Sequence, residues 1–376
     1  HSAFKTENTY FPAAIGLAAS WNRDLAREYG EALAEETRAV GRHCILAPGI
    51  NIHRTPLCGR NFEYFTEDPH LNGEMVVPLI KGVQSKRIAA CLKHFICNNT
   101  EYRRRFCNSV VGERAMHEIY FPGFKQAVQE ADPWVVMGSY NLVNGKYVYE
   151  KPDLLYKTLR KDWGFTGFVV SDWFATHSLS NPSLCIESGM NLEMPKAFAY
   201  RSDLVEKAFK AREFNESELD ANTREMLRTF FRVGLFDPEE KIPEGSRNNE
   251  EHLALARKII CEGSVLLKNE NEILPLDLSK TTKIHVSGKL ADYKPLIKSI
   301  GGSSSVHPPE RVTVLDGLER YGEKHNSKSN ETKGKIIFVK KPEDADVVLH
   351  ITGKTHWFYG DAEGMDKDRL ELSKKK

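Results

Sequence analysis

Short apolar runs alternate along the first two thirds of this chain with segments whose apolar residues recur every three or four positions. The runs are typical of buried parallel strands, and they cover residues 44–49, 88–92, 134–140, 167–170 and 189–195. The segments between them have helical spacing, at 24–40, 75–83, 113–130 and 152–163. A further helix is predicted to begin at Asn215, because Glu218 three residues later completes a capping-box pattern. Such alternation predicts an α/β fold with parallel strands joined by helical crossovers.

Polar or aromatic side chains follow these runs at the same end of each. They are Lys93 and His94, Tyr140, Asp172 and Trp173, and Glu193. This recurrence predicts a TIM-like (β/α) barrel with its site at the carboxyl ends of the strands. Only about five strands can be recognised where a full barrel has eight. We therefore expect a barrel that is irregular, or incomplete at its N-terminal end.

A second domain is expected after a charged segment rich in proline and glycine at 237–246. We predict a barrel domain over 1–236, a linker over 237–249 and a second α/β domain over 250–376. The second domain is predicted to begin with a helix at 250–263 and to contain strands at 265–267, 284–286 and 347–351.

Composition narrows the function classes. The 376 residues include 53 Lys and Arg against 52 Asp and Glu, so no strong field favours nucleic acid or an anionic membrane as a partner. No apolar run approaches the length of a membrane span. Seven cysteines without a CxxC pair, and histidines without metal-ligand spacing, predict neither a disulfide framework nor a metal site, and we expect no cofactor. The start of the sequence has no signal-peptide pattern, so we expect a cytoplasmic protein.

Two clusters are candidates for chemistry, and each has a plainer interpretation. Asp172, at a strand end beside Trp173, suits a carboxylate nucleophile, but it equally suits a cap for the next helix. Lys93 and His94, followed by several arginines, could hold sugar hydroxyls, or could form a surface salt-bridge cluster. The glycine- and serine-rich stretch 301–305 lacks the P-loop pattern, which argues against a phosphate site.

Motifs along nearly the whole chain occur in the order found in one known family. They are Arg60-Asn61-Phe62-Glu63 with Glu67-Asp68-Pro69, Lys93-His94-Phe95 with Asn98, Asn99, Glu101 and Arg104, Met137 with Ser139-Tyr140-Asn141, Ser171-Asp172-Trp173, Asn191-Leu192-Glu193-Met194-Pro195, Ser264-Val265-Leu266-Leu267-Lys268-Asn269 and Glu363-Gly364-Met365-Asp366. This ordered set resembles glycoside hydrolase family 3, the family of many β-glucosidases. The resemblance implies a TIM-like barrel followed by part of an α/β sandwich domain that supplies the acid/base.

The resemblance also implies site residues for a retaining mechanism. Asp172 matches the nucleophile that forms a glycosyl-enzyme, and Glu363 matches the acid/base. The residues that match the family's substrate-binding positions are Arg60, Lys93, His94, Arg104, Met137, Tyr140 and Trp173, with Ser303 closing the site from the second domain.

The implied activity is a β-glucosidase that releases glucose from the non-reducing end of β-glucosides. The Ser171-Asp172-Trp173 motif resembles the β-glucosidases more than many β-xylosidases. A β-xylosidase or α-L-arabinofuranosidase of the same family, and a non-catalytic carbohydrate-binding fragment, remain alternatives. The expected partner is a β-glucoside or oligosaccharide. A homo-oligomer is left open, as are remaining parts of the same enzyme on another chain or segment.

Overall fold

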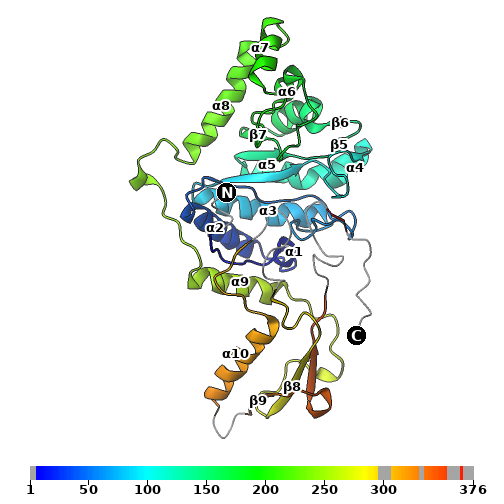
Figure 1. Ribbon diagram of the computed structural model, residues 1–376, viewed down its shortest axis with the longest axis vertical. Helices are drawn as coiled ribbons and strands as arrows, with labels where there is room; N and C mark the ends of the chain where they lie inside the picture. Colours follow the sequence, from blue (N-terminus) through cyan, green and yellow to red (C-terminus); the bar gives the residue numbers. More distant parts are fainter. Residues whose placement is uncertain (1–5, 295–305, 330–333, 354–364, 367–376) are drawn as a thin grey trace. The chain divides into compact units, whose positions relative to one another are not determined.

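The computed structural model describes residues 6–294, 306–329, 334–353 and 365–366 (Figure 1). These residues form two compact units. The barrel unit contains Phe11–Ser264 together with Met365 and Asp366, and the second unit contains 6–10 and the described part of 265–353. Each unit is described by itself.

A parallel four-stranded sheet is the centre of the barrel unit. Its strands are β1 (Cys44–Ile45), β2 (Ala89–Phe95), β4 (Val135–Gly138) and β7 (Phe168–Val170), in the order β1-β2-β4-β7. Single parallel bridges, Gly49 to Lys93 and Val170 to Leu192, extend the pairing beyond β1 and β7. The five apolar runs of the sequence therefore pair in sequence order, as parallel strands with crossovers predict.

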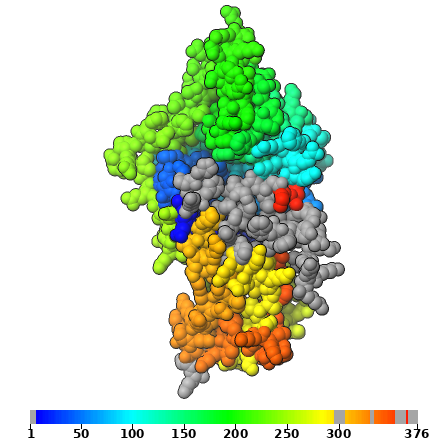
Figure 2. Space-filling model, viewed as in Figure 1, coloured from blue at the N-terminus to red at the C-terminus, as the bar shows by residue number. Residues whose placement is uncertain are grey.

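Helices connect these strands and cover the sheet. The main ones are α2 (Arg23–Ala39), α3 (Pro69–Ser85), α5 (Phe121–Ala131), η4 (Asp153–Asp162), α6 (Pro182–Ser188), α7 (Ser202–Lys210), α8 (Glu216–Arg232) and α9 (Glu250–Gly263), preceded by α1 (Ala14–Ala18). One of these helices, η4, is a π-helix. A second π-helix, η2 (Met116–Tyr120), lies between α4 (Glu113–Ala115) and α5. In Figure 1, α2, α3 and α5 lie one after another across the unit, while α7 and α8 form an exposed surface, green to yellow-green in Figure 2.

Local sequence signals account for several of these boundaries. Asn22 and Asp68 accept hydrogen bonds from main-chain N–H groups in the first turns of α2 and α3, as N-cap residues do. The capping box predicted from Asn215 and Glu218 is present at the start of α8. No helix in the described part of the chain is long and apolar enough to cross a membrane.

The side chains of the central strands alternate between two cores. Ala90, Leu92, Val136 and Val169 belong to the large core beneath the helices. Their sequence neighbours on the opposite strand face form a smaller core, which contains Ala89, Cys91, Val135, Met137, Phe168 and Val170. This is the period of two that a strand imposes on its side chains. It decides which polar residues at the strand ends share a face.

A small sheet lies beyond the main one. It consists of β3 (Asn108–Ser109), β5 (Leu142–Val143) and β6 (Lys146–Tyr147), with β5 and β6 antiparallel. Its short turn contains Asn144 and Gly145, both with positive φ, which suits a tight hairpin.

The second unit has a parallel three-stranded sheet in the order β10-β8-β9. Its strands are β8 (Thr282–Ser287), β9 (Ile336–Phe338) and β10 (Val347–His350), and α10 (Val314–Ser327) packs beside β9 (Figure 1). The prediction of a strand at 265–267 is wrong, because Val265, Leu266 and Leu267 are exposed and form no strand. Three apolar residues in a row are too short a signal to specify a strand without a neighbour to pair with.

Candidate active site

Two strands deliver the proposed nucleophile and a lysine to the same face of the sheet. Asp172 follows Phe168 and Val170 at a spacing of two, and Lys93 follows Ala89 and Cys91 in the same way. The residues that precede them lie in the same small core, so both side chains continue one face. Met137, on the strand between them, pairs with both Lys93 and Val170. Period and register together bring the candidate residues into one cluster.

Asp172 is buried in a polar environment, with 7% of its surface exposed. The N–H of Trp173 donates to Asp172 Oδ1 at 2.6 Å, and the Asp172 N–H donates to Tyr149 Oη at 3.1 Å. Burial raises the pKa of Asp172, although the charges of Arg60, Lys93 and Arg104 act in the opposite direction. The alternative role as a cap is not observed, since α6 is capped by Asn181.

His94 lies against the same carboxylate. Its Nε2 is 3.5 Å from Asp172 Oδ2, and the ring is almost completely buried. Asn51 fixes the main chain of His94 on both sides, accepting from its N–H and donating to its carbonyl oxygen. Burial, followed by the charges of Arg60, Lys93 and Arg104, holds the pKa of His94 well below its usual value. The ring is therefore neutral and can present one N–H and one acceptor nitrogen.

Glu63 joins the two buried cations of the cluster. Its Oε1 is 2.6 Å from Lys93 Nζ, and its Oε2 is 2.8 Å from both Nε and Nη2 of Arg60. Burial would raise the pKa of Glu63, but Arg60 and Lys93 outweigh it and the pKa is lowered. Glu63 was not among the site residues predicted from the sequence. The available signal was its spacing of three from Arg60, a residue that was predicted.

Arg104 and Tyr140 pack against each other at the edge of the cluster. The Arg104 guanidinium lies 4.2 Å from the centroid of the Tyr140 ring, and Arg104 Nη1 is 2.5 Å from Glu101 Oε2. Tyr140 donates its hydroxyl to the Trp173 carbonyl oxygen at 2.8 Å. Tyr140 therefore orders the segment that contains Asp172 and Trp173, in addition to lining the cluster.

A chain of hydrogen bonds connects Arg104 to His94 through Glu101, Asn98 and Tyr64. Glu101 accepts from Asn98 Nδ2 at 3.1 Å, and the same amide donates to Tyr64 Oη at 3.0 Å. Tyr64 Oη is in turn 3.3 Å from His94 Nδ1. These buried side chains fix the orientation of the imidazole.

Several buried atoms in and around the cluster have no hydrogen-bond partner among the described residues, and three of them belong to predicted site residues. These three are Arg60 Nη1, His94 Nε2 and Asp172 Oδ2. Buried polar groups are nearly always paired, so two potential donors beside a carboxylate oxygen suit a polar ligand rich in hydroxyls. The part of the chain that the structure describes contains no group of three or more His, Cys, Asp or Glu arranged to hold a metal. A buried carboxylate with no hydrogen-bond partner on one oxygen among the described residues is suited to nucleophilic attack.

Eight of the ten predicted site residues lie in this cluster or at its edge, and two cannot be placed. Ser303 and Glu363 fall outside the described residues. The nearest described position to Glu363 is Met365, followed by Asp366, whose carboxylate accepts the N–H of Glu101 within the barrel unit.

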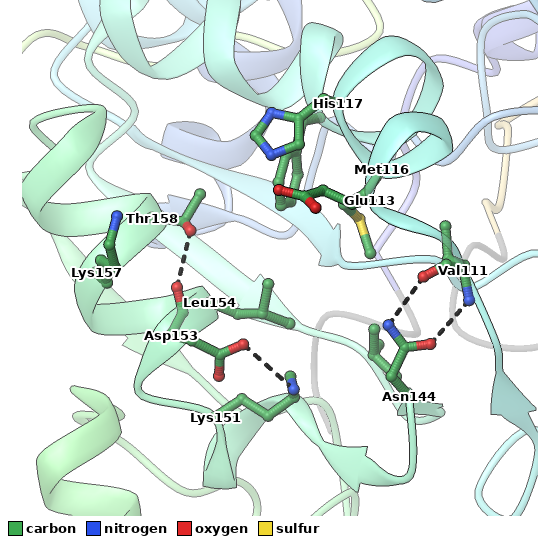
Figure 3. A pocket seen from close by; sticks show the side chains of 12 residues that line it. Val111, Glu113, Met116, His117, Asn144, Lys151, Asp153, Leu154, Lys157 and Thr158 are labelled. Carbon is green, nitrogen blue, oxygen red and sulfur yellow. Dashed lines mark hydrogen bonds and ion pairs between the residues drawn. The ribbon is translucent and has the colours of Figure 1, made fainter.

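A cavity of about 270 Å³ lies elsewhere in the barrel unit (Figure 3). Glu113 and His117 line it from one segment, and Lys151, Asp153 and Lys157 line it from another. Some of its polar groups pair with each other, since Lys151 pairs with Asp153 and Asn144 exchanges two hydrogen bonds with the main chain of Val111. The cavity has no residue in common with the Asp172 cluster.

Comparison with known proteins gives two family matches that cover most of the chain. Residues 1–229 match the glycosyl hydrolase family 3 N terminal domain, and residues 264–376 match the C-terminal domain of the same family. Among curated proteins, the chain is 40% identical over 314 residues to thermostable beta-glucosidase B of Acetivibrio thermocellus, covering 84% of this chain and 40% of that protein. It is 35% identical over 382 residues to an exo-alpha-(1->6)-L-arabinopyranosidase of Bifidobacterium breve, covering 98% of this chain and 49% of that protein.

Solved structures give the same result. Beta-glucosidase 3B from Thermotoga neapolitana in complex with glucose is 36% identical, with a TM-score of 0.81 over 98% of this chain and 55% of that one. A Bifidobacterium adolescentis beta-glucosidase is 33% identical, with a TM-score of 0.82 over 96% of this chain and 53% of that one. These likenesses confirm the predicted α/β class, with a TIM-like barrel followed by an α/β sandwich domain. The chain spans about 40% of the length of the first curated relative.

Proposed function

This chain belongs to glycosyl hydrolase family 3, and on that premise we propose that it is the part of a retaining β-glucosidase that holds the sugar and its nucleophile. The observation that supports this most directly is the buried Asp172, whose Oδ2 has no hydrogen-bond partner among the described residues and lies 3.5 Å from His94 Nε2. A carboxylate oxygen in such a position can attack a bound anomeric carbon without first breaking a hydrogen bond or a close ion pair.

The reaction needs two carboxyl groups. Asp172 attacks the anomeric carbon, and the bond to the leaving oxygen breaks as Glu363 donates its proton to that oxygen. Water then attacks the same carbon, Glu363 takes the proton from water, and Asp172 is released. Two inversions at one carbon give net retention, for which the two carboxyl groups must lie roughly 5–5.5 Å apart. The assignment of Glu363 rests on the Glu363-Gly364-Met365-Asp366 motif.

The buried cations are suited to holding hydroxyl groups rather than an anion. Glu63 already neutralises part of the charge of Arg60 and Lys93, and it fixes both side chains in place. A preorganised donor site of this kind discriminates strongly against a substrate that lacks the matching hydroxyl. We propose that Arg60, Lys93, His94 and Arg104 bind the hydroxyls of a terminal glucose, with Trp173 as a stacking wall.

A second substrate class is favoured by one comparison. The relative from Bifidobacterium breve is named an exo-alpha-(1->6)-L-arabinopyranosidase and is similar over nearly the whole chain. Pentopyranosides therefore belong beside glucosides in any test of specificity.

The decisive experiment measures kcat/KM of this protein for the hydrolysis of p-nitrophenyl β-D-glucoside, β-D-xyloside and α-L-arabinopyranoside. We expect the highest kcat/KM on the glucoside, with ¹H NMR showing the β-anomer as the first product. A first product of inverted configuration would exclude the retaining mechanism. Absence of hydrolysis together with measurable glucose binding would leave the carbohydrate-binding alternative.

A further inference from the structure

The carboxylate of Asp366 is bound by two loops that lie far from it in the sequence. Its Oδ1 accepts the N–H groups of Gly59 at 3.1 Å and Glu101 at 2.8 Å. Its Oδ2 accepts the N–H of Tyr102 at 3.0 Å and the Thr100 hydroxyl. Glu101 is 265 positions away in the chain, so only the folded protein brings these groups together. The segment 365–366, red in Figure 2, reaches the surface on the face shown.

This contact favours an ionised carboxylate. Burial alone would raise the pKa of Asp366, but the Thr100 hydroxyl and the N–H groups of Glu101, Tyr102 and Gly59 outweigh burial and lower it. Hydrogen bonds to an ionised acceptor are about twice as strong as neutral ones. Asp366 therefore holds the main chain of both loops through these hydrogen bonds, and we call this arrangement the Asp366 clamp.

The turn that Asp366 contacts has no regular secondary structure, and hydrogen bonds within the turn and from the Tyr147 hydroxyl to the Arg105 carbonyl oxygen also contribute to its shape. Residues 101–107 contain no helix or strand, Arg103 has positive φ, and Tyr102 and Phe106 are largely exposed. Turns with exposed side chains and no regular secondary structure open at a lower free-energy cost than core strands and helices. The same turn nevertheless supplies Arg104, which must stack on Tyr140 and pair with Glu101.

We propose that Asp366 is a positioning residue for sugar binding, which holds the 100–104 turn so that Arg104 faces the Asp172 cluster. The path is short, since Asp366 binds the Glu101 main chain and the Glu101 side chain binds Arg104. This inference rests on the proposed function for the identity of the sugar, but the clamp itself is independent of it. It makes a residue near the proposed acid/base part of the sugar-binding site in the barrel unit.

The test is a double-mutant cycle between Asp366→Asn and Arg104→Met. The amide nitrogen of Asn cannot accept, so two loop donors lose their acceptor: either the N–H groups of Gly59 and Glu101, or the Tyr102 N–H and the Thr100 hydroxyl. We expect Asp366→Asn to lower kcat/KM roughly 10- to 100-fold, as a small misplacement of a binding group does. If Asp366 acts through Arg104, the double variant loses no more than Arg104→Met alone, because coupled residues are not additive. Multiplicative losses would overturn the proposal.

The matched control is another carboxylate bound by main-chain groups in the same unit. Glu193 accepts the N–H groups of Phe198, Ala199 and Tyr200. Glu193→Gln removes a similar clamp without involving the 100–104 turn, so its effect should multiply with that of Arg104→Met. Equal coupling for both carboxylates would indicate general loosening and would count against Asp366. If Asp366→Asn does not fold, Thr100→Val removes one donor and should show a weaker loss with the same coupling.

A binding measurement separates this inference from the proposed function. The same cycle is run on the Kd for glucose by titration calorimetry, which requires no turnover. A protein that binds glucose without hydrolysing glucosides would contradict the proposed function, while coupling in Kd would still support the clamp. A loss in Asp366→Asn confined to substrates with poor leaving groups, and independent of Arg104, would assign its effect to proton donation and overturn the clamp. Absence of glucose binding and hydrolysis in the unsubstituted protein would overturn both.

Discussion

At the scale of single residues, the main feature is the Asp172 carboxyl group, whose pKa is raised by burial and lowered by nearby positive charges. Burial raises the pKa of Asp172, whereas Arg60, Lys93, Arg104 and the Trp173 N–H lower it. Because burial prevails, the ionised form of Asp172 is held at a cost in folding free energy. At a pH above its folded pKa, Asp172 reduces stability, and this loss disappears as the pH falls through that value.

Asp172→Asn should abolish turnover and preserve or increase stability. The amide cannot attack the anomeric carbon, so kcat should fall by at least about 10⁴-fold, as removal of a catalytic nucleophile does. The neutral amide also avoids the burial of a charge, so the midpoint of thermal unfolding at pH 7 should not fall. Asp172→Ala with added azide should yield the α-glycosyl azide. Hydrolysis at the unsubstituted rate by either variant in the absence of azide would exclude Asp172 as the nucleophile.

Lys93→Met should move the acidic limb of the pH profile to higher pH. That limb of kcat/KM follows the ionisation of Asp172 in the free enzyme. The Lys93 charge lowers the pKa of Asp172, so its loss raises that pKa and ionisation requires a higher pH. Lys86→Met, which removes a lysine paired with Glu35, is the control and should leave the limb in place. A shift to lower pH in Lys93→Met would contradict this account of the cluster.

At the scale of elements, α2 and α3 approach each other more closely than side chains usually permit. A Cβ on Gly30 would lie 2.2 Å from the Leu79 carbonyl oxygen, and one on Gly82 would lie 2.3 Å from that of Arg27. Each glycine therefore lets the main chain of the other helix fit against it. This close contact seats α3 beside β2, the strand that ends in Lys93 and His94.

Gly30→Ala should destabilise the protein although alanine favours a helix. In an unhindered helix the substitution gains about 0.5–1 kcal/mol, because glycine loses more entropy on folding. At Gly30 the clash is with main-chain atoms, so we expect a net loss of about 1–3 kcal/mol from overpacking. Gly16→Ala in α1 is the matched control, since its Cβ would meet only Pro12 Cβ at 3.8 Å. Urea unfolding of both variants should give opposite signs, and equal signs would refute the packing argument.

At the scale of the molecule, the chain returns to the start of the barrel unit after α8. Ser246 and the Asn248 N–H bind Glu35 and Glu36 of α2, and α9 follows at once. His252 in α9 brings Nδ1 to 2.8 Å from Glu36 and Nε2 to 3.2 Å from Glu35. The segment between α8 and α9 is thus fixed at its far end by a buried contact with α2.

His252→Leu should weaken this attachment. It removes a hydrogen-bond partner from the buried Glu36 and from the partly exposed Glu35, which should cost roughly 1–3 kcal/mol, as the loss of a partner for a buried polar group does. Cleavage between Asp237 and Asn249 in limited proteolysis should become faster. Lys258→Met is the control on the same helix, because its pair with Glu28 is exposed and should be worth less than about 1 kcal/mol. Similar losses in both variants would show that His252 does not anchor α9.

The sequence by itself determined what local interactions encode. The apolar runs predicted the five paired segments, and the spacing of Asn215 and Glu218 predicted the start of α8, because strand period and helix caps depend on residues only a few positions apart. The ordered motifs also predicted the family and most members of the Asp172 cluster. The same local signals led to the wrong strand at 265–267, where no neighbour is available to pair with it.

Only the tertiary structure decided how these residues hold one another. Glu63 bridges Arg60 on its own loop and Lys93 on β2, and Tyr140 gives its hydroxyl to the Trp173 carbonyl oxygen. Asp366 joins two loops at sequence separations of 265 and 307 residues. Contacts of this kind join residues that are distant in the sequence, so they form only when folding brings the strand ends and their loops together. The ordered motifs therefore predicted the residues of the candidate site, whereas the folded barrel determines which of them contact one another.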